Sequence, residues 1–258
     1  MRTPNAMAPY RIRSIERAAA VLQLLSGRAR RLGVVELAGQ LNLPKATVHG
    51  ILRTLRDAGF VEQDADSGKY QLGAALLHMG SSYLDGNELR SRALNWSDTL
   101  ASRTGESVRI GMLHEGRVLV VHHVFRPDDS RQALEVGALL PAHATALGKA
   151  LLAETPDALV EQALARFTPT TITEPDVLRA ELRQVRERGW ATDHEELVEG
   201  EGSYAAAVRD RRGIVVGAIG ISGPVQRLLP DGAPDTELVS YVREAARAVS
   251  RDLGAVPW

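Results

Sequence analysis

Cysteine is absent from the 258 residues of this chain, so disulfides, thiolate metal sites and a cysteine nucleophile are all excluded. Aromatic residues make up only 4% of the sequence. No apolar run approaches the roughly 20 residues of a membrane span. We expect no signal peptide before Arg11, and we expect residues 1–10 to form a disordered tail. Together these absences predict a cytoplasmic protein.

Net charge is also small, at −1, but it is unevenly distributed. Residues 1–72 hold eleven Lys and Arg against six Asp and Glu, a balance of +5, so the remainder carries −6. A local basic excess is what binding to the phosphates of duplex DNA requires, whatever the charge of the rest. With 44% hydrophobic residues, the chain can also build a second domain with its own core.

Residues 33–60 have the pattern of two short helices joined by a tight turn. The first helix has apolar residues at helical spacing, namely Val34, Leu37, Ala38 and Leu41. Asn42 favours a turn, and Pro44 stops the first helix but suits the first turn of the next. The second helix has an inward stripe made of Val48, Ile51, Leu52 and Leu55. This is a helix-turn-helix pattern.

The opposite face of the second helix carries hydrogen-bond donors and positive charge. Its residues are Lys45, Thr47, His49 and Arg53. Such a face can lie in the major groove and contact phosphates and base edges. A solvated helix pair in an all-α domain is the alternative, but it does not explain why the basic excess coincides with the helix pair. The pattern therefore favours DNA binding.

A hairpin is predicted after the second helix, with strands over residues 60–63 and 69–72 and a DADSG turn between them. Ser67 and Lys69 near its tip could contact phosphate or the minor groove. Ahead of the pair, a helix is predicted to be capped by Ser14 and ended by Gly27. Its apolar stripe is Ile15, Ala18, Ala19, Leu22 and Leu25. Residues 11–72 thus predict a winged helix-turn-helix domain.

Residues 73–86 are predicted to form a linker helix, and residues 87–254 a second domain. In that domain, helices are expected over residues 89–104, 145–153, 156–166, 175–188 and 235–253. Strands are expected over residues 107–114, 117–125, 132–136, 190–193, 203–209 and 214–222. Hairpins mixed with helices, without strict βαβ alternation, predict an α+β fold with an antiparallel sheet.

No group of residues in the second domain predicts catalysis. Its histidines include no His-x-x-x-His pair, and adjacent His122 and His123 would point to opposite faces of a strand. Ser203 and Ser222 lack a G-x-S-x-G elbow, and no phosphate loop is present. We therefore expect no metal, no cofactor and no enzyme. An enzyme acting on a small hydroxy acid is the alternative, and a small-molecule sensor is the more economical partner for a winged helix.

Several ordered motifs resemble the IclR-type regulators. SIERAAAVLQLL (14–25), LNLPKATVHGILRTLRDAGFVE (41–62) and GKYQLG (68–73) are similar to that family's winged helix. LPAHATALGKALLA (140–153), LRAELRQVRERGWATDHEE (178–196) and VGAIGISGP (216–224) are similar to its effector-binding domain. The resemblance covers residues 12–254, and residues 50–77 and 122–138 are most similar to the glycerol-operon regulators of the family.

The resemblance implies a GAF-like sheet whose effector pocket lies between the sheet and the loop before the HATALGKA helix. The matching positions in this chain are Leu140, Ala146, Leu147, Asp193, Ser203, Gly220 and Ser222. Many members have Cys where Ser203 stands and Ser where Gly220 stands, which argues against transferring a glyoxylate- or pyruvate-type ligand. Ala46 and Gly50 replace a common Ser and Arg, so the operator sequence is not transferred either.

The residues themselves favour an anionic effector. The helix that starts at residues 145–148 has small residues there, so its free N–H groups and dipole would attract an anion. The nearest positive charges in the sequence are Arg109, Arg126, Arg131 and Lys149, each of which could instead pair with a surface carboxylate. A small hydroxylated anion such as glycerol 3-phosphate suits this site. Asp193 would accept from a hydroxyl, and Ser203 and Ser222 would donate to the phosphate, or to the carboxylate of a carboxylated anion.

We therefore expect a transcriptional repressor that binds double-stranded operator DNA and responds to a small metabolite of a catabolic operon such as glycerol utilisation. A homodimer, and possible pairing of dimers into a tetramer, is expected because one winged helix buries too little DNA surface for specificity. Leu76, Leu77 and Leu84 are the predicted contact between protomers. Control of aromatic- or keto-acid catabolism is the alternative, and the low aromatic content does not support it. No membrane partner is expected.

Overall fold

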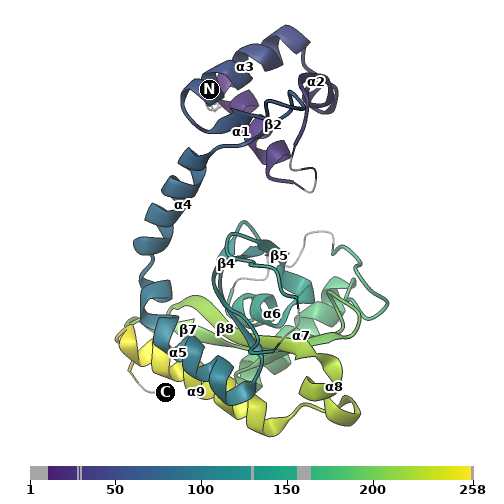
Figure 1. The fold of residues 1–258 in the computed structure, drawn as a ribbon. Coiled ribbons are helices and arrows are strands. Elements are labelled where there is room, and N and C mark those ends of the chain that lie inside the picture. The colour runs from purple at the N-terminus through teal and green to yellow at the C-terminus, as the bar shows by residue number, and fades with distance from the viewer. Residues whose placement is uncertain (1–10, 28, 30, 129–130, 156–163, 257–258) are drawn as a thin grey trace, which may run out of the picture. The chain divides into compact units, whose positions relative to one another are not determined.

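The computed structural model describes residues 11–27, 29, 31–128, 131–155 and 164–256, and it divides the chain into two compact units (Figure 1). The units are Met1–Gly86 and Asn87–Trp258. The tail predicted over residues 1–10 lies outside the described residues. Among the helices of the described ranges, none is both long enough and apolar enough to cross a membrane.

Within the described part of residues 11–72, three helices and a hairpin form, as predicted. The helices are α1 (Arg13–Leu25), α2 (Val34–Leu41) and α3 (Lys45–Asp57). The hairpin pairs β1 (Val61–Gln63) with β2 (Tyr70–Leu72) in antiparallel register. Leu37, Val48 and Leu52 are fully buried at the centre of the shared core. Burial of one face of each helix against the others is the main contribution to stability here.

The turn between α2 and α3 forms as the sequence predicts. Asn42 takes the left-handed conformation, with φ 50° and ψ 47°, which asparagine tolerates better than most residues. Its backbone N–H donates to Gly39 O at 3.3 Å and so ends α2. Pro44 then precedes Lys45 with φ −58°, the angle that its ring imposes.

Two details predicted for the first helix are wrong. Ile12, not Ser14, occupies the N-cap position of α1, and no side chain caps it. Val21 and Leu25 are the buried residues of this helix, whereas Ile15 is 63% exposed and Ala19 is also exposed. The prediction assigned the stripe by spacing alone, but the direction of α3 decides which face of α1 packs against it.

Helix α4 (Ala74–Asp85) covers the predicted linker, and none of its residues is buried. Leu77, Met79 and Tyr83 are 75%, 56% and 53% exposed, although all three are large and apolar. Leu76 and Leu84 are half-buried. Exposed apolar surface of this extent on one helix is typical of a surface that another chain covers.

The second unit is an antiparallel six-stranded sheet with strand order β5-β4-β3-β8-β7-β6 (Figure 1). Its strands are β3 (Ser107–His114), β4 (Arg117–Val124), β5 (Leu139–Pro141), β6 (Ala191–His194), β7 (Glu201–Arg209) and β8 (Val215–Pro224). Because β3 pairs with β8, the hairpins that are sequential in the chain join into one sheet. The α+β prediction is confirmed.

Helices pack on both faces of this sheet. Helices α5 (Glu88–Thr104) and α9 (Thr236–Asp252) pack on one another and on the sheet. Helices α6 (Ala146–Leu152) and α7 (Pro175–Arg188) form a separate apolar core with it. Three short helical segments lie between the longer elements, namely η1 (Ala142–Ala144) before α6, and α8 (Val225–Leu228) and η3 (Pro230–Gly232) before α9. All seven residues of α6 are buried, so this helix lies inside the unit.

The segment before β5 departs from the prediction. No strand forms over residues 132–136, which form a loop held by hydrogen bonds to the end of β4 and to the residues after it. Gln132 Oε1 accepts from Arg126 N–H at 2.7 Å, and Glu135 N–H donates to His123 Nδ1 at 3.3 Å. Residues 164–166 are not helical, and the rest of the helix predicted over 156–166 lies outside the described residues.

Candidate functional site

Helix α3 presents polar side chains on the face opposite its buried stripe. Lys45, His49 and Arg53 are exposed, and Thr47 is half-buried. On the inward face, Val48 and Leu52 are fully buried and Leu55 is 8% exposed. The amphipathic pattern therefore aims these four side chains away from the core, as the sequence predicts.

Lys69 has a different setting from the other four predicted DNA contacts. Its Nζ lies 3.2 Å from Glu36 Oε2 on α2, so the side chain joins the wing to the helix pair. The backbone N–H of Gly33 also donates to Glu36, and the two hydrogen bonds, Gly33 first and Lys69 second, lower the pKa of that carboxyl. In the wing turn, Asp64 accepts from Ser67 N–H at 2.8 Å and pairs with Arg31 at 2.9 Å.

A small cavity of about 80 Å³ with both polar and apolar lining residues lies in the second unit. Six of the seven predicted effector-binding residues line it, namely Leu140, Leu147, Asp193, Ser203, Gly220 and Ser222. They come from β5, α6, β6, β7 and β8, which are far apart in the chain. Ala146 is the exception, because its side chain is fully buried in the apolar core.

Gly220 lies where β7 and β8 approach closely. A Cβ at this position would come within 2.4 Å of Tyr204 O and 2.9 Å of Ala205 Cβ. Glycine is therefore required by the packing of this strand pair, and it adds no side chain to the cavity.

Asp193 and Ser203 form the acceptor side of the cavity. Ser203 Oγ donates to Asp193 Oδ2 at 3.1 Å, and Glu196 N–H donates to Asp193 Oδ1 at 2.8 Å. Ala146 N–H in turn donates to Ser203 Oγ at 3.4 Å. Burial raises the pKa of Asp193 to about 6, although the hydrogen bond from Glu196 opposes the rise. Asp193 is therefore a buried carboxylate that changes charge close to neutral pH.

Arg109 and Ser222 form the donor side. Arg109 Nη1 donates to Ser222 Oγ, which also lies 3.2 Å from Ser107 Oγ. The same guanidinium pairs with Glu135, with Nη2 to Oε1 at 2.9 Å and Nε to Oε2 at 2.5 Å. Of the four basic residues considered from the sequence, Arg109 is the one that lines the cavity. Glu135 also lines it and was not predicted, because its segment has the pattern of a strand.

Lys149 is committed to another contact. It is 1% exposed, and its Nζ lies 2.5 Å from Glu196 Oε1. Removing either partner of a buried pair leaves an unpaired charge, at a cost of about 3–5 kcal/mol. Lys149 therefore holds the loop after β6, from which Glu196 N–H donates to Asp193, and it does not line the cavity. Arg126 pairs with Asp128, and Arg131 is exposed outside the cavity, so neither supplies charge there.

The predicted free N–H groups at the start of α6 are largely satisfied within the chain. Thr145 Oγ1 accepts from Gly148 N–H at 3.2 Å, and Ala146 N–H donates to Ser203. A Cβ on Gly148 would lie 2.1 Å from Ala142 O, so this glycine allows α6 to pack on η1. Helix packing, and not access for a ligand, is the physical reason for the small residues. The positive side of the cavity is Arg109.

The two adjacent histidines of β4 have a packing role. His123 packs against Phe125 at 4.8 Å between ring centroids, and burial lowers the pKa of both His122 and His123. These two histidines are therefore mainly neutral near pH 7. Among the residues that the structure describes, no cluster of three His, Asp or Glu could hold a metal ion.

A winged helix with an outward polar face and a separate sheet unit with a polar cavity define a DNA-binding regulator with a ligand-sensing domain. The family models agree: residues 14–65 match the IclR helix-turn-helix domain, and residues 81–251 match the bacterial transcriptional regulator IclR C-terminal domain. The chain belongs to the IclR family of transcriptional regulators, which bind DNA through the first domain and an effector through the second.

Individual relatives agree along nearly the whole chain. The glycerol operon regulatory protein of Streptomyces griseus is 57% identical over 95% of this chain and 97% of its own length. The HTH-type transcriptional repressor AllR of Klebsiella pneumoniae is 35% identical over 95% and 91%. The crystal structure of an IclR transcriptional regulator from Alicyclobacillus acidocaldarius is 28% identical, with a TM-score of 0.81 over 95% of this chain and 100% of that one. These relatives are regulators and not enzymes.

Proposed function

We propose that this protein represses an operon for glycerol utilisation and that glycerol 3-phosphate, or a close analogue, is its effector. The observation that carries the proposal is 57% identity, over 95% of the chain, to a glycerol operon regulatory protein. The 35% identical relative is named a repressor, which supports the sign of regulation. Because operator DNA is the target, we propose that the protein works in the cytoplasm.

The cavity offers one group of each kind that this effector needs. Arg109 and Ser222 can donate to a phosphate, and guanidinium suits phosphate because it presents several N–H groups in a plane. Asp193 and Ser203, which follow Ser222 in one cross-strand row, can bind hydroxyl groups beside it. A volume of about 80 Å³ suits a three-carbon molecule better than a large one. In this proposal the phosphate competes with Glu135 for Arg109, so binding rearranges the loop that carries Glu135.

Ligand binding must be coupled to DNA for this proposal to hold. An effector that releases the operator binds the DNA-free protein more tightly, and DNA must weaken effector binding by the same factor. We expect calorimetry to show weaker binding of glycerol 3-phosphate in the presence of operator DNA, by about 5- to 150-fold. Glycerol and inorganic phosphate serve as controls for the two halves of the ligand. Equal affinity with and without operator would exclude glycerol 3-phosphate as the effector.

For DNA recognition we propose that α3 lies in the major groove. Thr47, His49 and Arg53 would contact base edges, because all three lie outside the buried stripe of α3. Lys45 at the first turn would contact phosphate, and Lys69 would do so from the wing while paired with Glu36. We assign residues 11–72 to DNA binding, 73–86 to the linker and 87–254 to effector binding.

We also propose that two chains pair through the exposed apolar face of α4. Leu77 and Tyr83 are more than half exposed in the single chain, and their burial would stabilise a dimer. Leu77→Glu is expected to shift the protein toward monomer, since burying the charge costs more than the pairing gains. Light scattering at micromolar concentration measures this, with Ser82→Glu as the control, because Ser82 is an exposed polar residue on the opposite face of the same helix. A wild-type monomer with intact operator binding would contradict the proposal. Further pairing into a tetramer would use the effector domains.

A further inference from the structure

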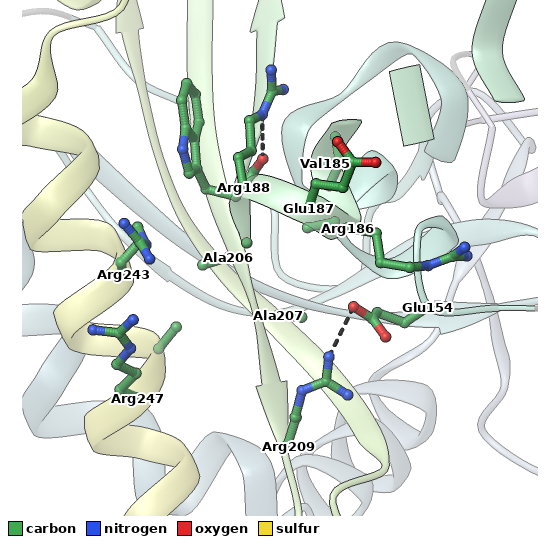
Figure 2. A pocket seen from close by; sticks show the side chains of 14 residues that line it. Glu154, Val185, Arg186, Glu187, Arg188, Ala206, Ala207, Arg209, Arg243 and Arg247 are labelled. Atoms are coloured by element: carbon green, nitrogen blue, oxygen red, sulfur yellow. Dashed lines mark hydrogen bonds and ion pairs between the residues drawn. The ribbon is translucent and has the colours of Figure 1, made fainter. Parts of the chain in front are cut away.

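A second and larger hollow, of about 270 Å³, lies in the effector unit beside residues 189–190, just before the N-terminal end of β6. Strand β6 pairs with β7 only up to Ala205, so the last part of β7 has an edge that β6 does not cover. The hollow lies at this edge, where Ala206 and Ala207 point to opposite faces of the strand and their small side chains leave space on both sides. Figure 2 shows Arg243 and Arg247 on one side of these alanines and Glu154 and Arg186 on the other.

The residues that line this hollow are strongly basic as a group. They include five arginines and two glutamates, which leaves a formal charge of +3, whereas the whole chain carries −1. The five come from α7, β7 and α9 and are Arg186, Arg188, Arg209, Arg243 and Arg247. Like charges gathered in a hollow repel one another and destabilise the fold unless something compensates them.

Contacts within the chain account for three of the five arginines. Arg186 Nε donates to Ala153 O at 2.7 Å, at the end of α6. Arg188 Nη2 pairs with Glu181 Oε1 at 2.8 Å, which neutralises one of the five charges, and its Nε donates to Trp190 O at 2.8 Å. Arg209 Nη2 lies 2.8 Å from Glu154 Oε1. These arginines hold the carbonyl end of α6, the turn after α7 and the end of β7 in place.

The positions of Arg243 and Arg247 are not accounted for by contacts of this kind. Within the part of the chain that the structure describes, neither has a carboxylate or carbonyl partner, although Arg243 is half-buried against the hollow. They stand four residues apart on α9, so they are neighbours on one helix face, and a like-charged pair at this spacing is destabilising. Neither lies in the last turn of α9, where the helix dipole would favour a cation.

We propose that this hollow binds a small molecule with two or more negative charges on a phosphate or on carboxylates. Guanidinium groups from α9 and from β7 would contact the oxyanion from different sides, which is how arginine recognises phosphate and carboxylate. The hollow shares no lining residue with the cavity that holds Asp193 and Ser222, so it is a second ligand site. It goes beyond the proposed effector and offers the regulator a separate metabolic signal.

The test is calorimetry of the full-length protein with inorganic pyrophosphate and, separately, with citrate, at constant ionic strength. Constant ionic strength keeps general screening equal in all titrations. We expect one site per chain for one or both probes. Arg243→Gln and Arg247→Gln should each weaken it about tenfold, the effect of removing one charge-assisted hydrogen bond. Arg251→Gln is the matched control, because Arg251 is an exposed arginine of α9 outside the hollow.

Glu154→Gln is expected to change anion affinity in the opposite direction from the arginine variants. Removing this carboxylate releases Arg209 and makes the hollow more positive, so pyrophosphate or citrate should bind more tightly. A purely structural role of Glu154 would predict the reverse. Ser222→Ala should leave this binding unchanged, which separates it from the proposed effector site. No binding of either probe, or equal loss in the Arg243→Gln and Arg251→Gln variants, would overturn the proposal.

Discussion

Asp193→Asn and Ser222→Ala are each expected to abolish the release of operator DNA by glycerol 3-phosphate, while operator binding without effector stays unchanged. Both side chains line the cavity of the second unit, and neither lies in the DNA-binding unit. Ser222→Ala removes the hydroxyl that Arg109 contacts. Asp193→Asn keeps the shape but removes the negative charge and replaces one of the two acceptor oxygens by an NH2 donor. Operator isotherms with and without glycerol 3-phosphate measure both effects.

Ser240→Ala is a suitable control, since Ser240 is an exposed serine of α9 that does not line the cavity. A full effector response in both cavity variants would refute the assignment of this cavity. Loss of operator binding in the absence of effector would show instead that these residues stabilise the fold.

The dependence of effector affinity on pH provides a second test of the role of Asp193. Because burial raises the pKa of Asp193 to about 6, this carboxyl is mostly ionised at pH 7 and mostly protonated at pH 5. The folded chain therefore binds this proton more tightly than the unfolded chain, and its contribution to stability falls as pH rises from about 4 to about 6. Effector affinity should fall as pH is lowered from 7 to 5. Phosphate titrates in this range too, so the part of the decrease that Asp193→Asn removes belongs to Asp193.

In the recognition helix, Thr47→Ala or His49→Ala is expected to weaken specific operator binding by about 1–3 kcal/mol for each interaction with a base edge that the substitution removes. Both side chains lie outside the buried stripe that holds Val48 and Leu52, with His49 exposed and Thr47 half-buried, so the substitutions leave that stripe in place. Arg53→Ala should have an effect of the same kind. Binding isotherms on operator and on random duplex DNA separate specific from general binding.

Lys45→Ala should behave differently, because a phosphate contact carries no sequence information. It should weaken binding to every duplex and reduce the slope of log affinity against log salt by about 1. Arg56→Ala is the control, since Arg56 is an exposed cation in the last turn of the same helix. Wild-type operator affinity in the Thr47, His49 and Lys45 variants together would rule out α3 as the recognition helix.

The sequence by itself determined the parts of this protein that depend on local physics. Asn42 and Pro44 fix the turn before α3, because one tolerates a left-handed conformation and the other cannot continue a helix. Regular spacing of apolar residues fixed α3 and its outward face, and α7 and β3 begin and end at the predicted residues. The motifs also identified the family, and with it six of the residues that line one cavity.

Only the tertiary structure decided which groups meet and which charges remain available. Arg109, Arg126 and Lys149 have the same kind of charge in the sequence, but packing commits Lys149 to Glu196 and Arg126 to Asp128 and places Arg109 at the cavity. The strand predicted over residues 132–136 became a loop, because Glu135 pairs with Arg109 from a distant strand. The five arginines of the second hollow lie between residues 186 and 247, and no local pattern brings them together. The pairing of β6 with β7 and the packing of α9 on β7 bring these arginines together, because strand order in the sheet, and not position in the chain, decides which side chains are neighbours.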